Sequence, residues 1–165
     1  MSITSSARRV ARLLKAAGCK VVIAESCTGG LVSGALTKIP GISDYHCGGV
    51  VVYRNETKMA YLDIPAKLLA EPGPVSTDVA QLMARRVLEL TPEADLAVSV
   101  TGHLGPNAPP KLDGQVYVAV AWRSDAVESH SLRCHRRDSR AQRQRWVIEQ
   151  VLDLLATSLK DSLTL

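Results

Sequence analysis

A serine followed by small residues is the first feature of this chain that could do chemistry. Ser26 comes directly after the short apolar run 20–24, in the segment Ala24-Glu25-Ser26-Cys27-Thr28-Gly29-Gly30. Small residues let a substrate approach the backbone, and N–H groups at the start of a helix can hold an oxyanion or a phosphate. We expect Ser26 to be a nucleophile and four residues after it to bind the substrate: Cys27, Thr28, Gly29 and Gly30. An N-cap followed by a tight turn is the alternative interpretation.

Tyr53 and Lys58 form a second candidate pair. A lysine can take a proton from a serine only when its amine is neutral, and its reference pKa of about 10.4 must then be lowered by burial or by nearby positive charge. We expect Lys58 to act as the base in an enclosed pocket, with Tyr53 relaying the proton or orienting the lysine. A tyrosine at an interface beside a surface lysine is the alternative.

Ser26 has two neighbours that could also take part. Cys27 is an alternative nucleophile, because a helix N-terminus lowers the pKa of a thiol. We place it well below Ser26, since adjacent side chains leave such a turn in different directions. Glu25 could orient Lys58, but a structural contact is the interpretation we favour.

Two further sites could hold a substrate. Thr101 and Gly102 follow the apolar run 95–100 and could position the leaving group or add a backbone donor, although a turn at a strand end explains them equally well. Arg140 lies among six arginines between positions 133 and 145, and its planar guanidinium matches phosphate oxygens. Spacing does not show which arginine of the cluster reaches a site, and a solvated helix face is the alternative.

The totals exclude several classes of protein. The four cysteines form no Cys-x-x-Cys pair and the four histidines lack metal-ligand spacing, so we expect neither a metal nor a disulfide framework. No apolar run approaches the roughly 20 residues of a membrane span, and we expect a cytoplasmic protein. The net charge is +4, but no aromatic stripe or zinc-finger signature accompanies it, so a small phosphate explains the charge as well as nucleic acid does. We expect a small-molecule ligand and no nucleic acid.

The elements that must position these residues follow from the apolar pattern. The 165 residues are 46% hydrophobic and only 4% aromatic, which suits one domain of buried strands covered by helices over residues 1–165. We expect strands at 20–24, 47–53, 95–100, 115–122 and 126–134, the last two as a hairpin. We expect helices at 5–17, 31–37, after an Asn55 N-cap, after Pro65, from Ser76 or Thr77 to about 91, and at 139–159. The Pro- and Gly-rich stretch 103–114 is a candidate lid.

Several segments together resemble the CinA C-terminal-domain family, whose members include nicotinamide-nucleotide amidases. The matching segments are 24–30, Pro-Gly-Ile-Ser at 40–43, Gly-Gly-Val-Val-Val-Tyr-Arg-Asn-Glu-Thr-Lys at 48–58, Gly-Pro-Val-Ser at 73–76, Thr-Gly-His-Leu-Gly-Pro at 101–106 and Gly-Gln-Val-Tyr-Val-Ala at 114–119. Each alone is weak, but their order over nearly the whole chain is highly specific.

The resemblance implies an α/β fold, a three-layer α/β/α sandwich around a mixed, mostly parallel five-stranded sheet, and a homodimer. It implies an amidase that converts nicotinamide mononucleotide into nicotinate mononucleotide and ammonia with no cofactor. Ser26 matches the family's nucleophile, Tyr53 and Lys58 its activating pair, Thr101 its substrate-loop threonine, and Arg140 an arginine before the last helix. Longer relatives carry a separate pyrophosphatase-type activity, which we do not expect from this chain.

Some residues depart from the family pattern. Leu104 stands in place of an alanine, and Asn107-Ala108-Pro109-Pro110 in place of a glycine-rich run, which makes the loop stiffer. Arg54 replaces a Ser or Thr, and Gln144 a second arginine. The alternative to an amidase is therefore a catalytically silent nucleotide-binding or damage/competence-associated module of the same fold. A third hypothesis is nucleic-acid binding through the arginines between 133 and 145, with strong salt dependence as its signature.

Overall fold

Short runs of β-branched and small apolar residues form five strands in the computed structural model, which describes residues 2–164. β1 is buried along its whole length, as a strand with helices on both sides must be, whereas β5 alternates between half-buried and exposed residues. The expected strands are all present, with ends that differ by no more than two residues. They are β1 (Val21–Glu25), β2 (His46–Val51), β3 (Leu96–Gly102), β4 (Gln115–Trp122) and β5 (Val127–Arg133).

The sheet is mixed, as expected. Its strand order is β2-β1-β3-β4-β5. β1 pairs in parallel with β2 and β3, whereas β4 pairs antiparallel with both β3 and β5, so that β4 alone runs in the opposite direction. The carboxyl ends of β1, β2 and β3 therefore meet at one edge of the sheet, where ligands gather in open α/β folds.

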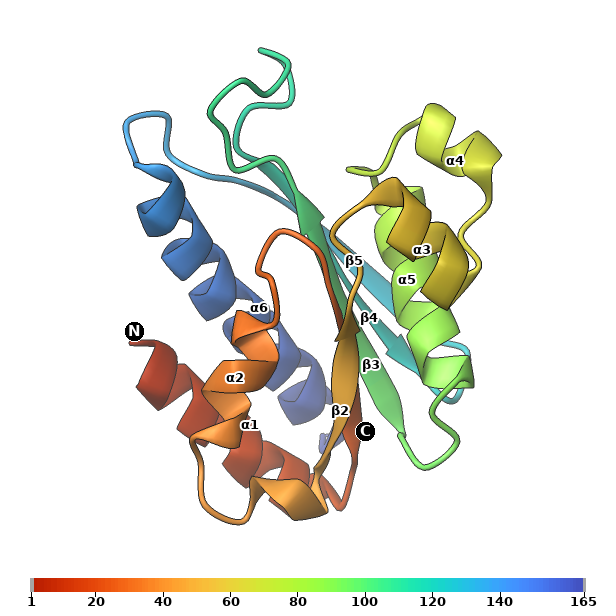
Figure 1. Ribbon diagram of the computed structural model, residues 1–165. Helices are drawn as coiled ribbons and strands as arrows, with labels where there is room; N and C mark the ends of the chain where they lie inside the picture. The colour runs from red at the N-terminus through yellow and green to blue at the C-terminus, as the bar shows by residue number, and fades with distance from the viewer. Residues whose placement is uncertain (1, 165) are drawn as a thin grey trace.

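Helices cover both faces of the sheet, which gives three layers (Figure 1). α1, α2 and α6 pack on one face, and α3, α4 and α5 on the other. A hydrophobic core lies on each face of the sheet, and alternate residues of β1 point into each. Val21 and Ile23 pack against the first group of helices, and Val22 and Ala24 against the second. The helices are α1 (Ile3–Ala17), α2 (Leu31–Thr37), α3 (Asn55–Leu62), α4 (Ala66–Ala70), α5 (Thr77–Glu89) and α6 (Arg140–Ser162), with a 3₁₀ turn η1 (Ile42–Asp44).

Two helix starts that the sequence predicted have different outcomes. Ser76 caps α5 as expected, because its hydroxyl accepts the Val79 N–H at 3.3 Å. Asn55 is not the N-cap of α3; it is the first residue of the helix, and Arg54 is the N-cap. The Thr57 hydroxyl accepts the Arg54 N–H at 3.2 Å and donates to the Arg54 carbonyl at 2.9 Å, which fixes the start of the helix.

Thr101 and Gly102 lie inside β3 and not in a turn after it. The ladder between β3 and β4 continues into the following loop, where the His103 N–H donates to the Gln115 carbonyl and the Gly114 N–H to the His103 carbonyl, both at 2.9 Å. The two ends of the loop 103–114 are thus hydrogen-bonded to each other and, through His103, to the first residue of β4. No helix within residues 2–164 is long and apolar enough to cross a bilayer.

Candidate active site

The turn after β1 presents Ser26 at the carboxyl edge of the sheet. The Ser26 N–H donates to the Val100 carbonyl of β3 at 3.0 Å, which fixes the serine where the two strands end. Gly29 and Gly30 then adopt φ values of 61° and 94°, and these left-handed conformations bend the chain into α2. Only 6% of Ser26 is exposed. The sequence expectation of a strand, a small-residue turn and a helix is confirmed.

Glu25 occupies the start of α2. Its buried carboxylate accepts hydrogen bonds from the Thr28 hydroxyl at 2.6 Å and from the N–H groups of Gly30, Val32 and Ser33 at 2.8–3.1 Å. The Gly29 N–H donates to the Ser26 carbonyl. The Gly29 N–H, which we expected to be free together with those of Cys27 and Thr28, is therefore already bonded, and the carboxylate of Glu25 satisfies the start of the helix. Substrate contact by Gly29 and Gly30 stays a prediction.

Two N–H groups of the turn remain available. In the part of the chain that the structure describes, the N–H groups of Cys27 and Thr28 have no hydrogen-bond acceptor. The Gln144 side chain of α6 donates to the Cys27 carbonyl at 3.2 Å and holds this peptide in place. Gln144, which stands where the family commonly has an arginine, thus stabilises the turn. The two free amides next to Ser26 are the candidate oxyanion donors.

Lys58 reaches Ser26 from α3. Its Nζ lies 3.0 Å from the Ser26 Oγ and donates to the Val52 carbonyl at 2.9 Å. Lys58 is only 2% exposed, and among residues 2–164 no carboxylate forms an ion pair with it. Burial lowers the pKa of Lys58 to about 8. About a tenth of the amine is therefore neutral at pH 7 and about half at pH 8, and the neutral form is the one that a base for the serine requires.

Lys58 should make the stability of the fold depend on pH. Its pKa is lowered on folding, so above about pH 8 the unfolded chain keeps a proton that the folded protein has lost. Stability therefore rises with pH through this window, relative to a Lys58→Met variant that cannot titrate. From about pH 7 to about pH 9.5 we expect wild type to gain about 2 kcal/mol on the variant. Urea unfolding of both proteins measures this gain, and a difference that does not change with pH would show that the pKa is not lowered.

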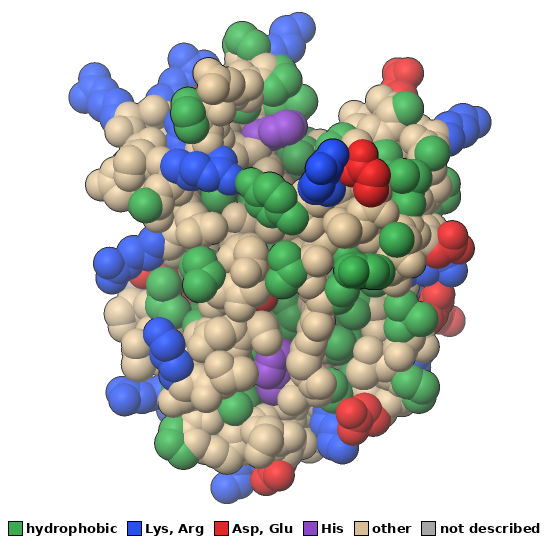
Figure 2. All heavy atoms as spheres, in the orientation of Figure 1, with side chains coloured by type: hydrophobic (Ala, Val, Ile, Leu, Met, Phe, Trp, Pro, Cys, Tyr) green, Lys and Arg blue, Asp and Glu red, His purple; other side chains and the backbone are tan. Residues whose placement is uncertain are grey.

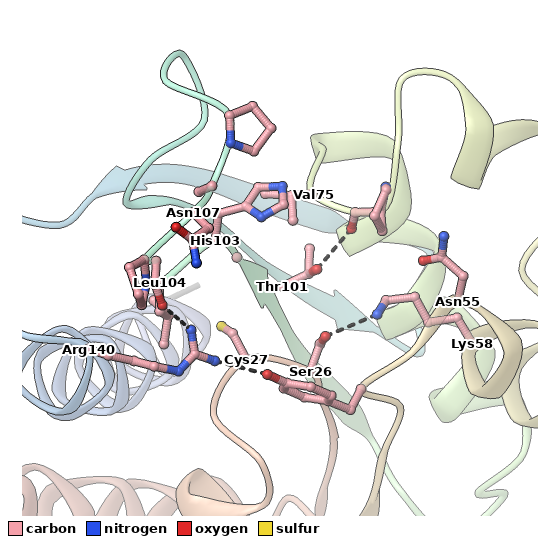
Figure 3. Close-up of a pocket in the computed structure, with 17 residues that line it drawn as sticks. Ser26, Cys27, Asn55, Lys58, Val75, Thr101, His103, Leu104, Asn107 and Arg140 are labelled. Atoms are coloured by element: carbon pink, nitrogen blue, oxygen red, sulfur yellow. Dashed lines mark hydrogen bonds between the residues drawn. The ribbon is translucent and has the colours of Figure 1, made fainter.

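Tyr53 and Arg140 meet at the mouth of the site. The Arg140 guanidinium, at the first residue of α6, donates to the Tyr53 hydroxyl at 2.9 Å and also to the Gly105 carbonyl (Figure 3). Tyr53 is 58% exposed, and within residues 2–164 its hydroxyl makes no hydrogen bond to Lys58. The structure thus brings Tyr53 to the pocket but places its hydroxyl on Arg140.

Thr101 and Gly102 lie in the wall of the pocket. The Thr101 hydroxyl is buried and donates to the Pro74 carbonyl at 2.8 Å, which ties β3 to the segment before α5 (Figure 3). At Gly102 an added Cβ would lie 2.7 Å from Val116 and 3.2 Å from the Cys27 sulfur. Gly102 is therefore required for close packing at this point, whatever its contact with a substrate.

Cys27 is a poor nucleophile. Its side chain is 3% exposed, and burial raises the pKa of the thiol to about 12. The lowering expected from a helix N-terminus is absent because Glu25 already neutralises that end of α2 and because the thiol lies in an apolar core.

A cavity of about 290 Å³ is lined by Ser26, Lys58, Tyr53, Thr101 and Arg140. Figure 2 shows a notch at the top of this face, with basic side chains and a histidine on its rim. Three polar lining residues were not expected from the sequence: Asn55, His103 and Asn107. Burial lowers the pKa of His103, which favours the uncharged form of its imidazole. The position of His103 directly after Thr101-Gly102 was the signal that could have identified it.

Two of the departures from the family pattern make contacts of their own, whereas residues 107–109 line the cavity. Arg54 forms an ion pair with Glu56 at 3.2 Å, and its side chain is 76% exposed. Leu104 is 2% exposed and packs in the core beside α6. Within residues 2–164 no group of three or more His, Cys, Asp or Glu side chains could hold a metal ion.

Two curated relatives share much of this sequence. A CinA-like protein from Geobacter metallireducens is 46% identical over 114 residues, which are 68% of this chain and 27% of that protein. A CinA-like protein from Trichodesmium erythraeum is 38% identical over 157 residues, which are 94% of this chain and 37% of that protein. The chain therefore spans well under half the length of these curated relatives.

Solved structures share the fold. The competence/damage inducible protein CihA from Agrobacterium tumefaciens superposes with a TM-score of 0.89 at 34% identity, covering 96% of this chain and 95% of that one. A competence-damaged protein (CinA) superfamily protein from Klebsiella pneumoniae has a TM-score of 0.91 at 28% identity, covering 98% and 99%. The model of the CinA C-terminal domain family matches residues 3–159. The chain belongs to the CinA C-terminal domain family.

Proposed function

We propose that this protein hydrolyses a carboxamide, with Ser26 as the nucleophile and Lys58 as its base. The observation that carries the proposal is the 3.0 Å contact between the serine hydroxyl and a buried lysine amine that has no carboxylate partner in the described chain. With a pKa of about 8, this amine can take a proton from the serine and return it within the same catalytic cycle.

The proposed reaction is acyl transfer in two halves. Neutral Lys58 takes the hydroxyl proton as the Ser26 Oγ forms a bond to the carboxamide carbon, and the N–H groups of Cys27 and Thr28 stabilise the resulting oxyanion. Lys58 then gives the proton to the leaving nitrogen, and ammonia departs. Water attacks the acyl-serine with Lys58 again as base. The bond between the acyl carbon and the Ser26 Oγ then breaks, Lys58 returns the proton to this oxygen, and the carboxylic acid is released. The Val52 carbonyl holds the lysine in position throughout.

The proposed substrate is a pyridine mononucleotide, nicotinamide mononucleotide, and the products are nicotinate mononucleotide and ammonia. Family resemblance suggests this substrate, and the pocket supports it. Arg140 stands at the mouth with N–H groups beyond those used on Tyr53 and Gly105, as a phosphate requires. His103, Asn55 and Asn107 add uncharged polar groups between the mouth and the serine.

An ammonia assay on the purified wild-type protein tests this function. We expect release from nicotinamide mononucleotide and much slower release from free nicotinamide, which lacks the phosphate. A protein that binds the mononucleotide but yields no ammonia would instead be a silent nucleotide-binding module, in keeping with the competence and damage names of its relatives.

Nucleic-acid binding is disfavoured because Arg133 and Arg143 of the arginine cluster donate their N–H groups to acceptors within the chain.

Tyr53→Phe should weaken substrate binding and leave the chemical step intact. The hydroxyl accepts a hydrogen bond from Arg140 and is not in contact with the lysine, so its loss frees the guanidinium without changing the base. We expect KM to rise about 3- to 10-fold, the effect of one hydrogen bond, with kcat and its pH profile unchanged. Steady-state kinetics over a range of pH measures both parameters. A large fall in kcat would contradict this prediction and would show that Tyr53 takes part in proton transfer.

A further inference from the structure

An ion pair between a buried guanidinium and a half-buried carboxylate lies outside the proposed catalytic groups. The Arg143 guanidinium of α6 donates to both carboxylate oxygens of Asp113, at 2.7 and 3.1 Å. Arg143 is only 5% exposed, and the hydrogen bond from its guanidinium holds the pKa of Asp113 below its usual value. Exposed ion pairs contribute little to a fold, but a bidentate pair in this position fixes the geometry of both partners.

Arg143 joins three segments of the chain. Besides Asp113, it donates to the carbonyls of Leu104 at 3.4 Å, His135 at 3.3 Å and Arg136 at 3.1 Å. The first lies at the start of the loop 103–114, and the other two lie in the connection that leads into α6. A single guanidinium therefore ties both ends of the loop to the helix.

The pair fits tightly beneath the loop. An added Cβ at Gly105 would lie 3.1 Å from both the Arg143 Nη1 and the Asp113 Oδ1, and Gly105 has a φ of +66°. Gly105 and Leu104 line the cavity, and Arg140, one turn before Arg143, donates to the Gly105 carbonyl. The wall of the cavity opposite Lys58 thus depends on this contact.

The reacting groups are held by other elements. Ser26 is fixed by the Val100 carbonyl, and Lys58 by the Val52 carbonyl. None of these four residues belongs to the loop or to α6. The turn after Ser26 is linked to α6 by the bond from Gln144 to the Cys27 carbonyl, and Asp113→Asn removes no atom of it. A change in the ion pair should therefore alter the wall of the cavity and leave the distance between Ser26 and Lys58 unchanged.

We propose that Asp113 and Arg143 are positioning residues that fix the loop 103–114 as a rigid wall of the substrate cavity and thereby set substrate affinity. The loop is then not the free lid that its prolines and glycines suggested. Its base is fixed, and opening is confined to the tip around 106–111. The effect on affinity rests on the proposed amidase function, whereas the effect on the loop does not.

Asp113→Asn tests the proposal, because it keeps the shape of the side chain and removes its charge. We expect KM for nicotinamide mononucleotide to rise about tenfold, because the loop residues that bind the substrate are misplaced. We expect kcat to stay within about twofold of wild type, because Ser26 and Lys58 keep their positions. Arg143→Lys, which keeps the charge but not the fork, should lie between wild type and Asp113→Asn. Glu89→Gln, which breaks the exposed pair with Arg86, is the matched control and should change neither parameter.

Amide hydrogen exchange gives a readout that needs no activity. The N–H groups of His103, Leu112 and Gly114, which bond within the loop or to the sheet, should exchange faster in both variants, while that of Ser26 keeps its wild-type rate. Folded variants with wild-type loop exchange and unchanged KM would overturn the proposal. Faster loop exchange in a protein whose wild type releases no ammonia would support the positioning role and refute the amidase function.

Discussion

Ser26→Ala is expected to abolish ammonia release from nicotinamide mononucleotide. The substitution removes only the hydroxyl that lies 3.0 Å from the Lys58 amine. Loss of a nucleophile that works with its base typically costs on the order of 10⁴-fold or more in kcat. The assay compares the variant with wild type and with Ser43→Ala, an exposed serine on η1 that should have no effect. Activity near the wild-type level would remove Ser26 from the mechanism.

Binding should survive in the same variant. The contact of the Ser26 N–H with the Val100 carbonyl and the bonds of Glu25 around the turn use no Ser26 side-chain atom. Calorimetric titration with the mononucleotide should therefore give a Kd within a few fold of wild type. Loss of binding together with activity would point to a damaged pocket and not to a missing nucleophile.

Lys58→Met should have the second largest effect. It keeps the length and apolar stem of the side chain but removes the base, and we expect kcat to fall on the order of 10³-fold or more. Lys67→Met, at an exposed position on α4, is the control. In wild type the neutral amine is the active form, so kcat/KM should rise with pH and level off above about 8. A profile that is flat between about pH 6 and about pH 9 would exclude Lys58 as the titrating base.

The fold and the contact between Ser26 and Lys58 could be predicted from the sequence because each leaves a signal in short segments. Consecutive residues form the apolar runs of β1 and β3 and the glycine turn after Ser26, so each can be recognised locally. The order of the family segments then predicts that Lys58 lies at the carboxyl edge of the sheet, beside Ser26. The contact between positions 26 and 58 follows from parallel pairing of β1 with β2, which brings the ends of both strands together.

The partners of the substrate-binding groups could not be predicted in the same way. The residues next to Glu25 do not show that its carboxylate, and not a ligand, accepts hydrogen bonds from the start of α2. Three of the N–H donors lie five to eight residues further along the chain. The pairing of Arg143 with Asp113 spans thirty residues and depends on how α6 packs against the loop. Within the arginine cluster, packing alone decides that Arg143 is buried while Arg140 stands at the mouth.

The tethered carboxylate at the start of α2 also bears on the design of inhibitors. Because Glu25 is part of the same chain, its carboxylate has a high effective concentration at the N–H groups of Gly30, Val32 and Ser33. A soluble oxyanion cannot match this concentration and does not displace the carboxylate. A compound that imitates the tetrahedral intermediate should therefore aim its negative charge at the amides of Cys27 and Thr28, and place any second charge near Arg140, two anchor points on different elements that a rigid scaffold could span.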